Sequence, residues 1–207
     1  MRRRAFLASA LTAASTTAAG CSAADSQTEH TNPTVTTDDG PRDNGKYLEF
    51  HGGSGTLATV GVDPEFSPLP SFFFTSISHP EDTELRSLTQ RFVALDGNGT
   101  PPRLSLQGPF MGDYEPHPSV SLFRDGKAAV VDVHRFGELA DETVFIELPV
   151  TRWPESASRL VVESTVKLVE PGVIDRTHVL DGQLEFEFTT ETETDERTAE
   201  SLGSSGS

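Results

Sequence analysis

Apolar residues recur at every second position over several stretches of the central part of the chain. Leu184, Phe186 and Phe188 form one such row, with acidic residues between them. Residues 144–150 and 160–168 contain two further rows of the same kind. Because successive side chains of a strand point to opposite faces of a sheet, each row predicts a strand with one buried and one solvated face. Such half-buried strands are typical of antiparallel sheets.

Turn signals stand between the strand-like runs. Asp-Gly at residues 125–126 and 181–182 predicts two tight hairpins, since this pair readily adopts the positive dihedral angles of the turn. Looser glycine-rich turns are expected at residues 52–55 and 96–99. One short helix is expected over residues 80–88, where proline and acids come first and two leucines lie three positions apart.

The short strands and their turns define the fold class. About ten strands are expected within residues 45–189, which favours an all-β fold: an antiparallel β-sandwich, immunoglobulin-like or jelly-roll-like. The flanking residues are polar and acidic and cannot bury enough apolar surface to offset their ordering entropy, so both flanks are expected to be flexible. The expected organisation is a signal peptide (1–20), a linker (21–44), a β-sandwich domain (45–189) and a disordered acidic tail (190–207).

The first 20 residues have the pattern of an export signal. Arg3 and Arg4 are followed, after one residue, by Phe6 and Leu7, and then by a weakly apolar run. This run is too short and too polar for a transmembrane helix, which needs about 20 predominantly apolar residues. The segment resembles a twin-arginine signal peptide, and the resemblance implies that the chain is exported.

Small residues lead up to Cys21, the only cysteine of the chain. The segment from Ala18 to Cys21 resembles a lipobox, which implies that Cys21 carries a lipid and begins the mature protein. The expected location is therefore the extracellular face of the cell membrane, with the lipid anchor in the membrane. Ala18 stands where lipoboxes usually have leucine, so the alternative is ordinary cleavage nearby and a secreted product.

The chain is strongly acidic, with 16 basic and 32 acidic residues and a formal net charge of -16. Because the first 20 residues hold three arginines and no acid, the remainder has 13 basic residues and a net charge of -19. Such a charge repels nucleic acid and anionic lipid, so neither is an expected partner. Together with the presence of only three lysines, it resembles the composition of haloarchaeal proteins, in whose solvent high salt screens the repulsion between carboxylates. The alternative is an acidic protein from a low-salt environment.

Cysteine usage and the histidine pattern limit the chemistry. If Cys21 is lipidated, the mature protein has no thiol, which excludes a cysteine nucleophile, a thiolate zinc site, an iron–sulfur cluster and a blue-copper centre. Acids and histidines alternate near His117 and near His134, but prolines flank His117, and His134 fits the solvated face of a strand. We therefore expect no metal site, no cofactor and no catalytic residue.

Three motifs allow both a functional and a structural interpretation. Residues 51–55 resemble the oxyanion-hole segment of lipase-like α/β-hydrolases, but the chain lacks the G-x-S-x-G nucleophile motif of that family, which favours a hairpin turn. Asn98 begins an Asn-Gly-Thr sequence in an expected turn and is a candidate for N-glycosylation. Residues 72–74 are three consecutive phenylalanines, either a binding platform or a central strand packed on both faces, and the excess of phenylalanine over tryptophan and tyrosine favours packing.

These patterns favour a non-enzymatic cell-surface module that binds or scaffolds an extracytoplasmic protein or glycan. The alternative is an extracytoplasmic hydrolase or metal-dependent enzyme, which a pocket gathering several histidines with carboxylates would indicate. A third interpretation, a subunit of an envelope complex, predicts a contiguous apolar surface patch.

Overall fold

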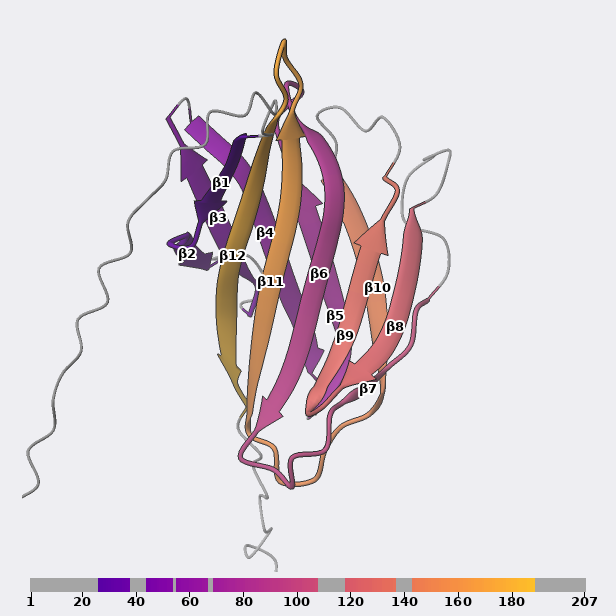
Figure 1. The fold of residues 1–207 in the computed structure, drawn as a ribbon. Helices are drawn as coiled ribbons and strands as arrows, with labels where there is room; N and C mark the ends of the chain where they lie inside the picture. The colour runs from indigo at the N-terminus through magenta and orange to yellow at the C-terminus, as the bar shows by residue number, and fades with distance from the viewer. Residues whose placement is uncertain are drawn as a thin grey trace, which may run out of the picture.

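The computed structural model describes residues 26–37, 44–53, 55–66, 69–107, 118–136 and 143–188. The predicted signal peptide, the lipidation site and the predicted acidic tail lie outside these residues. The described chain folds into two six-stranded sheets packed face to face, so the predicted all-β sandwich is confirmed (Figure 1). The described residues contain no helix long and apolar enough to cross a membrane.

The two sheets are here called sheet A and sheet B. Sheet A has the order β1 (Ser26–His30), β12 (Arg176–Glu187), β11 (Arg159–Glu170), β6 (Glu84–Leu95), β9 (Ala128–His134) and β8 (Ser119–Asp125). Sheet B has the order β2 (Thr34–Thr37), β3 (Lys46–Gly52), β4 (Gly55–Phe66), β5 (Pro70–Ser78), β10 (Thr143–Arg152) and β7 (Arg103–Leu104). Neighbouring strands are antiparallel except β1 and β12, which run parallel.

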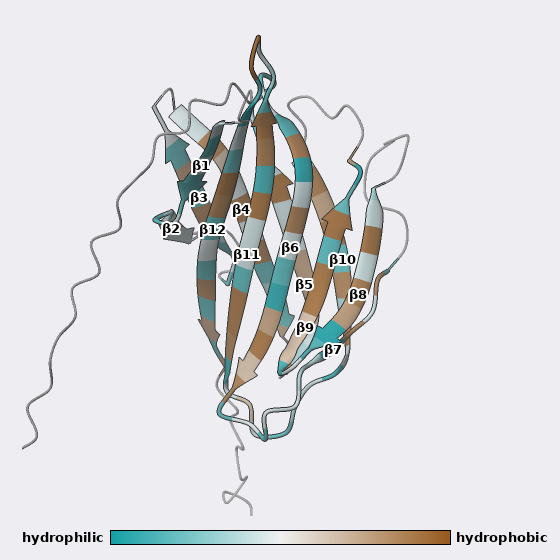
Figure 2. Ribbon diagram, viewed as in Figure 1, coloured by the Kyte–Doolittle hydropathy of each residue, from teal (hydrophilic) through white to brown (hydrophobic). Residues whose placement is uncertain are grey.

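The core lies between the sheets and is built from the alternating rows. On β12, Leu184 and Phe186 are 1% and 3% exposed, while Glu185 and Glu187 face solvent. The rows on β10 and β11 also turn their apolar residues inward, and apolar and polar bands alternate along the strands (Figure 2). The period-two pattern therefore assigned the inner faces of these strands correctly.

The hairpin expected at residues 125–126 is confirmed, with Gly126 at a φ of 58° between β8 and β9. The turn expected at residues 181–182 is wrong, because β12 continues straight through it. A Cβ on Gly182 would lie 2.8 Å from Cγ of Pro33 and 3.0 Å from Cδ1 of Leu48. Gly182 is thus required because other residues pack closely against the strand at this point. An Asp-Gly pair can therefore mark close packing within a strand as well as a turn.

The helix expected over residues 80–88 is also wrong. A turn closed by the Thr83 N–H to the Pro80 carbonyl at 3.1 Å leads directly into β6. In the pairing with β11, Leu85 lies opposite Leu168, and Ser87 lies opposite Lys167. Arg86 has no opposite residue and forms a bulge. Because of this bulge, Leu85 and Leu88 both point into the core. The extra residue changes the inward spacing from two to three, which imitates a helical period.

The ordered chain begins earlier than the expected domain boundary at residue 45. The expected linker, residues 21–44, contains β1 on sheet A and β2 on sheet B. Both strands are polar and mostly exposed, and they are joined to β12 and β3 through their backbones. An edge strand can be held by main-chain hydrogen bonds without apolar side chains, so its composition resembles that of a flexible segment.

Candidate functional site: an open edge between the sheets

The outermost strand of sheet A, β8, is the most exposed apolar edge of the described sandwich. It pairs with β9 in unbroken register from Ser119 to Asp125. The side chains of Leu122 and Phe123 are 37% and 50% exposed. An exposed edge strand presents unpaired backbone groups and is a ready template for another strand.

The other three edges are shorter or more polar. In sheet B, β7 has two residues and β2 has four. The second edge of sheet A is β1, which has five residues and no large apolar side chain. Short and charged edges are the usual protection against strand addition, and β8 has neither feature over most of its length.

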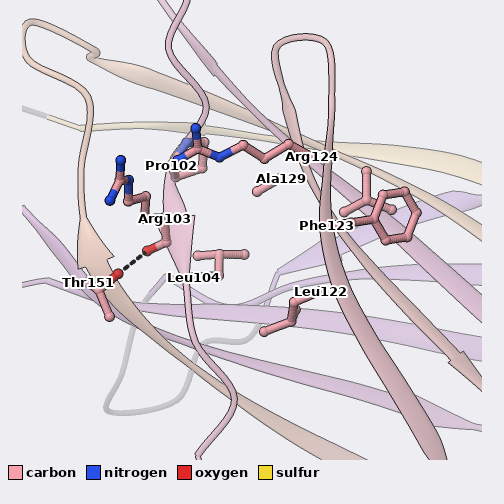
Figure 3. A pocket seen from close by; sticks show the side chains of 9 residues that line it. Pro102, Arg103, Leu104, Leu122, Phe123, Arg124, Ala129 and Thr151 are labelled. Atoms are coloured by element: carbon pink, nitrogen blue, oxygen red, sulfur yellow. Dashed lines mark hydrogen bonds between the residues drawn. The ribbon is translucent and has the colours of Figure 1, made fainter.

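A groove of about 260 Å³ lies between β8 and β7. Leu104 of β7 and Leu122 of β8 form its two apolar walls, and Ala129 and Val130 of β9 complete the lining on the side of sheet A. Figure 3 shows the guanidinium groups of Arg103 and Arg124 at the end of the groove next to Pro102. The backbone of β7 is fixed here by the hydroxyl of Thr151, which donates to the Arg103 carbonyl at 3.1 Å.

The two arginines of the groove differ from the arginines of the outer face of sheet A. Arg91 contacts Asp125 at 2.5 Å and Glu163 at 3.0 Å. Arg159 contacts Asp96 at 2.6 Å and Glu185 at 3.0 Å.

Arg103 and Arg124, by contrast, form no ion pair with an acid within the described residues. Within the described residues, the groove therefore holds two cationic side chains that no acid neutralises directly.

The polar side chains of the turn at residues 96–99 are bonded to other groups of the protein. The hydrogen bond from Arg159 lowers the pKa of Asp96, and Ser158 donates a further hydrogen bond to the same carboxylate at 3.3 Å. Asn98 is exposed, and its Oδ1 accepts the backbone N–H of Thr100 at 3.0 Å. Glycosylation of Asn98 remains a prediction for an accessible turn.

The described histidines do not gather in one pocket. His79 is buried against Thr83, whose hydroxyl lies 3.0 Å from its Nδ1. His51 and His134 are surface residues beside acids, at 3.8 Å and 3.5 Å. His30 and His178 form a separate pair at the opposite edge of sheet A from β8. His117 lies outside the described residues, and within them no group of three metal-ligating side chains occurs.

The phenylalanines at residues 72–74 divide between the two faces of β5. Phe73 is fully buried and contacts Phe92 with ring centroids 5.3 Å apart. Phe72 and Phe74 lie on the outer face, half-buried, with centroids 4.5 Å apart. Core packing is therefore confirmed for Phe73 only. The expectation of cover on both faces is wrong among the described strands, since sheet A packs on one face of β5.

The arginines of the groove were missed in the sequence, although one signal for β8 was present. Leu122 and Phe123 are consecutive, so in a strand one of them must point away from the core. Arg103 and Arg124 are 21 positions apart and belong to different sheets, so no local pattern could bring them together.

The chain belongs to the family described as Domain of unknown function (DUF8121), whose model matches residues 27–190. The match begins inside β1, in agreement with an ordered domain that starts well before residue 45. Among proteins with curated annotation, none matches the sequence.

Several solved structures are similar in fold. A cohesin module from a Clostridium perfringens family 33 glycoside hydrolase has a TM-score of 0.36 and 17% identity, covering 64% of this chain and 94% of the module. The human F-spondin reeler domain has a TM-score of 0.35 and 14% identity, covering 65% and 90%. A collagen-binding domain from a Staphylococcus aureus adhesin has a TM-score of 0.31 and 11% identity, covering 62% and 96%. Likeness at this level extends to the β-sandwich alone.

Proposed function

We propose that this protein is an exported, lipid-anchored binding module of the cell surface that takes an extended acidic peptide segment along β8. The observation that carries the proposal is the open edge, where an exposed apolar strand borders a groove with two arginines. Export and anchoring are supported by the twin-arginine pattern and by Cys21.

The geometry favours an extended partner. A strand added beside β8 would satisfy the backbone groups of the edge, and its alternate side chains would enter the groove. Leu122 and Arg124 both face the groove and are two positions apart. A matching segment therefore has an aliphatic residue and an acid two positions apart, so that the first meets Leu122 and the second meets Arg124.

The electrostatics favour an acidic partner. The rest of the surface is dominated by carboxylates, which repel an acidic peptide wherever arginines are absent. An acidic peptide therefore gains the most electrostatic attraction when it contacts Arg103 and Arg124. The same contacts align the peptide along β8, since complementary charges fix the register of a complex.

The test uses a fluorescent peptide, Thr-Glu-Thr-Leu-Thr-Glu-Thr, which presents leucine between two glutamates in either strand direction. We expect saturable binding by fluorescence anisotropy to the full chain. Arg103→Glu combined with Arg124→Glu should weaken binding about tenfold or more, because attraction becomes repulsion. Binding should also weaken as the salt concentration rises, because the ion pairs are screened.

Two controls separate this effect from unfolding and from net charge. The double variant Arg86→Glu with Lys167→Glu changes the net charge equally but lies outside the groove, so it should bind like the wild type. A peptide with lysine in place of both glutamates should not bind. Equal affinity of the groove variant and the control variant, with unchanged melting temperatures, would refute the groove as the binding site.

The export and anchoring part has its own test. We expect the mature protein to fractionate with membranes and to carry a thioether-linked lipid on Cys21, visible in its intact mass. Cys21→Ser should release the protein into the medium, and Arg3→Lys with Arg4→Lys should retain the precursor inside the cell. An unmodified, soluble wild type would contradict the anchor, and normal export of the double lysine variant would contradict the twin-arginine assignment.

A further inference from the structure

The connection between β11 and β12 ends in two exposed aliphatic residues. It comprises residues 171–175, here called the β11–β12 tip, between Glu170 and Arg176, which lie opposite each other at the end of the ladder. Val173 is 107% exposed and Ile174 is 62% exposed. Figure 1 shows the tip projecting beyond the ends of the other labelled strands, and Figure 2 shows apolar residues at its end. The part of this hairpin that lies farthest from the core is therefore apolar.

The acids that flank the two aliphatic residues are engaged by donors of the protein. The carboxylate of Asp175 accepts the backbone N–H of Gly172 at 3.2 Å, which closes the tip. Glu170, at the base of the tip, contacts Arg176 at 3.7 Å. The aliphatic side chains thus form the free surface of the tip, while the nearest carboxylates already have partners.

Two other described turns of the sandwich are polar. The hairpin between β8 and β9 is formed by Asp-Gly-Lys at residues 125–127, and the turn at residues 96–99 by Asp-Gly-Asn-Gly. Single exposed apolar residues are ordinary on protein surfaces. Two consecutive ones at the end of a projecting hairpin favour a contact with an apolar partner.

The first strand of the described domain begins beside the tip. β1 runs parallel to β12, so Ser26 lies opposite Arg176, the first residue of β12. Ser26 also lines the same hollow of about 550 Å³ as the two aliphatic side chains of the tip. Only four residues, 22–25, separate Ser26 from Cys21.

This short connection fixes the end of the sandwich at which a lipid on Cys21 lies. The twelve residues of β12 extend about 40 Å, at about 3.4 Å per residue. That length is more than twice what the five Cα steps from Cys21 to Ser26 can span. The lipid is therefore confined to the end of the sandwich that carries the tip.

We propose that the β11–β12 tip enters the surface of the lipid bilayer and forms a second membrane contact beside the lipid on Cys21. This inference rests on the lipid anchoring proposed above. Burial of Val173 and Ile174 at the boundary between headgroups and acyl chains removes apolar surface from water, and binding at this boundary scales with the buried apolar area. Because the chain is acidic, the contact depends on apolar burial and not on headgroup charge.

The two contacts have different roles. Two aliphatic side chains are too few to hold the domain on a membrane by themselves, since interfacial binding of a small apolar area is weak and reversible. The lipid on Cys21 keeps the tip at the bilayer, so its entry becomes an intramolecular step. The lipid thus determines where the protein is located, and the tip determines how the domain is oriented.

The experiment uses the full mature protein, lipidated on Cys21, in vesicles of phosphatidylcholine, which has no net charge. Intact mass and flotation with the vesicles test the anchor. Because Cys21 is the only cysteine and the lipid blocks its sulfur, Ile174→Cys adds a single thiol for an NBD fluorophore. Lipids with nitroxide groups in their acyl chains should quench this fluorophore about twofold or more, because the tip reaches the acyl-chain boundary.

Two control variants carry the same fluorophore. Lys127→Cys places it in the exposed β8–β9 hairpin, at the opposite end of sheet A, and should not be quenched. Val173→Asp combined with Ile174→Cys should lose most of the quenching, because a carboxylate opposes entry into the bilayer. A readout without a fluorophore is amide hydrogen exchange of residues 172–175, which should be slower in vesicles than in the free Cys21→Ser protein.

The outcomes separate the tip from the anchor. If the protein floats with the vesicles and quenching at position 174 is no stronger than at position 127, the tip contact is overturned and the anchor stands. Equal quenching with and without Val173→Asp also overturns the tip contact, because the fluorophore and not the tip then enters the bilayer. A protein that carries no lipid and does not float contradicts the anchoring proposal, and the tip contact with it.

Discussion

At the residue scale, the two faces of β12 differ sharply in what a substitution should do. Phe186 is 3% exposed and lies in the central core, with the ammonium group of Lys46 5.2 Å from its ring centroid. Phe186→Ala should lower the free energy of unfolding by about 3–5 kcal/mol, since it creates a cavity. Glu187→Ala on the solvated face should change it by only a few tenths of a kcal/mol. Denaturant titration in molar salt compares the two, and equal sensitivity would contradict a strand with one wet face.

Gly182 provides a second test at this scale, because it is required by packing and not by its backbone angles. Gly182→Ala would place a methyl group 2.8 Å from Pro33 and 3.2 Å from Cζ of Phe50. Overpacking of this kind costs about 1–3 kcal/mol. The matched control is Gly53→Ala, where no atom lies within 4 Å of the new Cβ, and the expected change is smaller. Equal melting temperatures for the two variants would contradict the close packing of Pro33 and Phe50 against Gly182.

At the scale of elements, the contact between β1 and β12 should depend on pH. His30 has a lowered pKa, so between 6.5 and its folded value the unfolded chain binds a proton there more readily than the folded chain does. Stability should therefore fall as the pH drops from 7.5 to 5.5. His30→Gln should show a smaller fall, because it removes the imidazole whose pKa is lowered by burial and by the charge of His178. Thermal melts across this pH range measure the difference, and identical pH profiles for the wild type and the variant would contradict it.

The strands also show which features of the fold could be predicted from the sequence and which could not. Alternating rows such as Leu184 and Phe186 identified strands and their inner faces, because burial on one face imposes a period of two. The same reasoning failed at Arg86, where a bulge changed the spacing, and at Gly182, where a packing demand resembled a turn. It failed again for β1, whose order comes from backbone pairing with a distant strand.

The groove and the histidine pair were beyond prediction for a related reason. Each depends on residues from strands far apart in the chain: Arg103 with Arg124, and His30 with His178. Sequence patterns report local periodicity, whereas strand order places these partners side by side. The candidate chemistry at residues 51–55 was correctly interpreted as a turn, since Gly52 pairs with Gly55 at the end of the β3–β4 hairpin.

At the scale of the whole molecule, the net charge of -16 should make folding dependent on salt. Mutual repulsion of carboxylates opposes the compact state, and its range falls from about 10 Å at 0.1 M salt to about 3 Å at 1 M. The melting temperature should therefore rise between 0.1 M and 3 M KCl. Ion pairs such as Arg91 with Asp125 are screened too, but the 16 bases can offset only part of the 32 acids. A flat or falling melting temperature would contradict the halophilic interpretation.

The position of β1 sets how far the domain could stand from a bilayer. Under the proposed anchoring, Cys21 and Ser26 are separated by five Cα steps, which span at most about 18 Å. The domain would then have a short reach, with its β1 edge nearest the lipid headgroups. Five strand spacings, about 24 Å, separate that edge from β8.

A partner held in the same membrane would therefore meet β8 by lateral diffusion within a thin layer. Confinement of both molecules to that layer raises their effective concentration, so even a weak peptide contact would be occupied for much of the time.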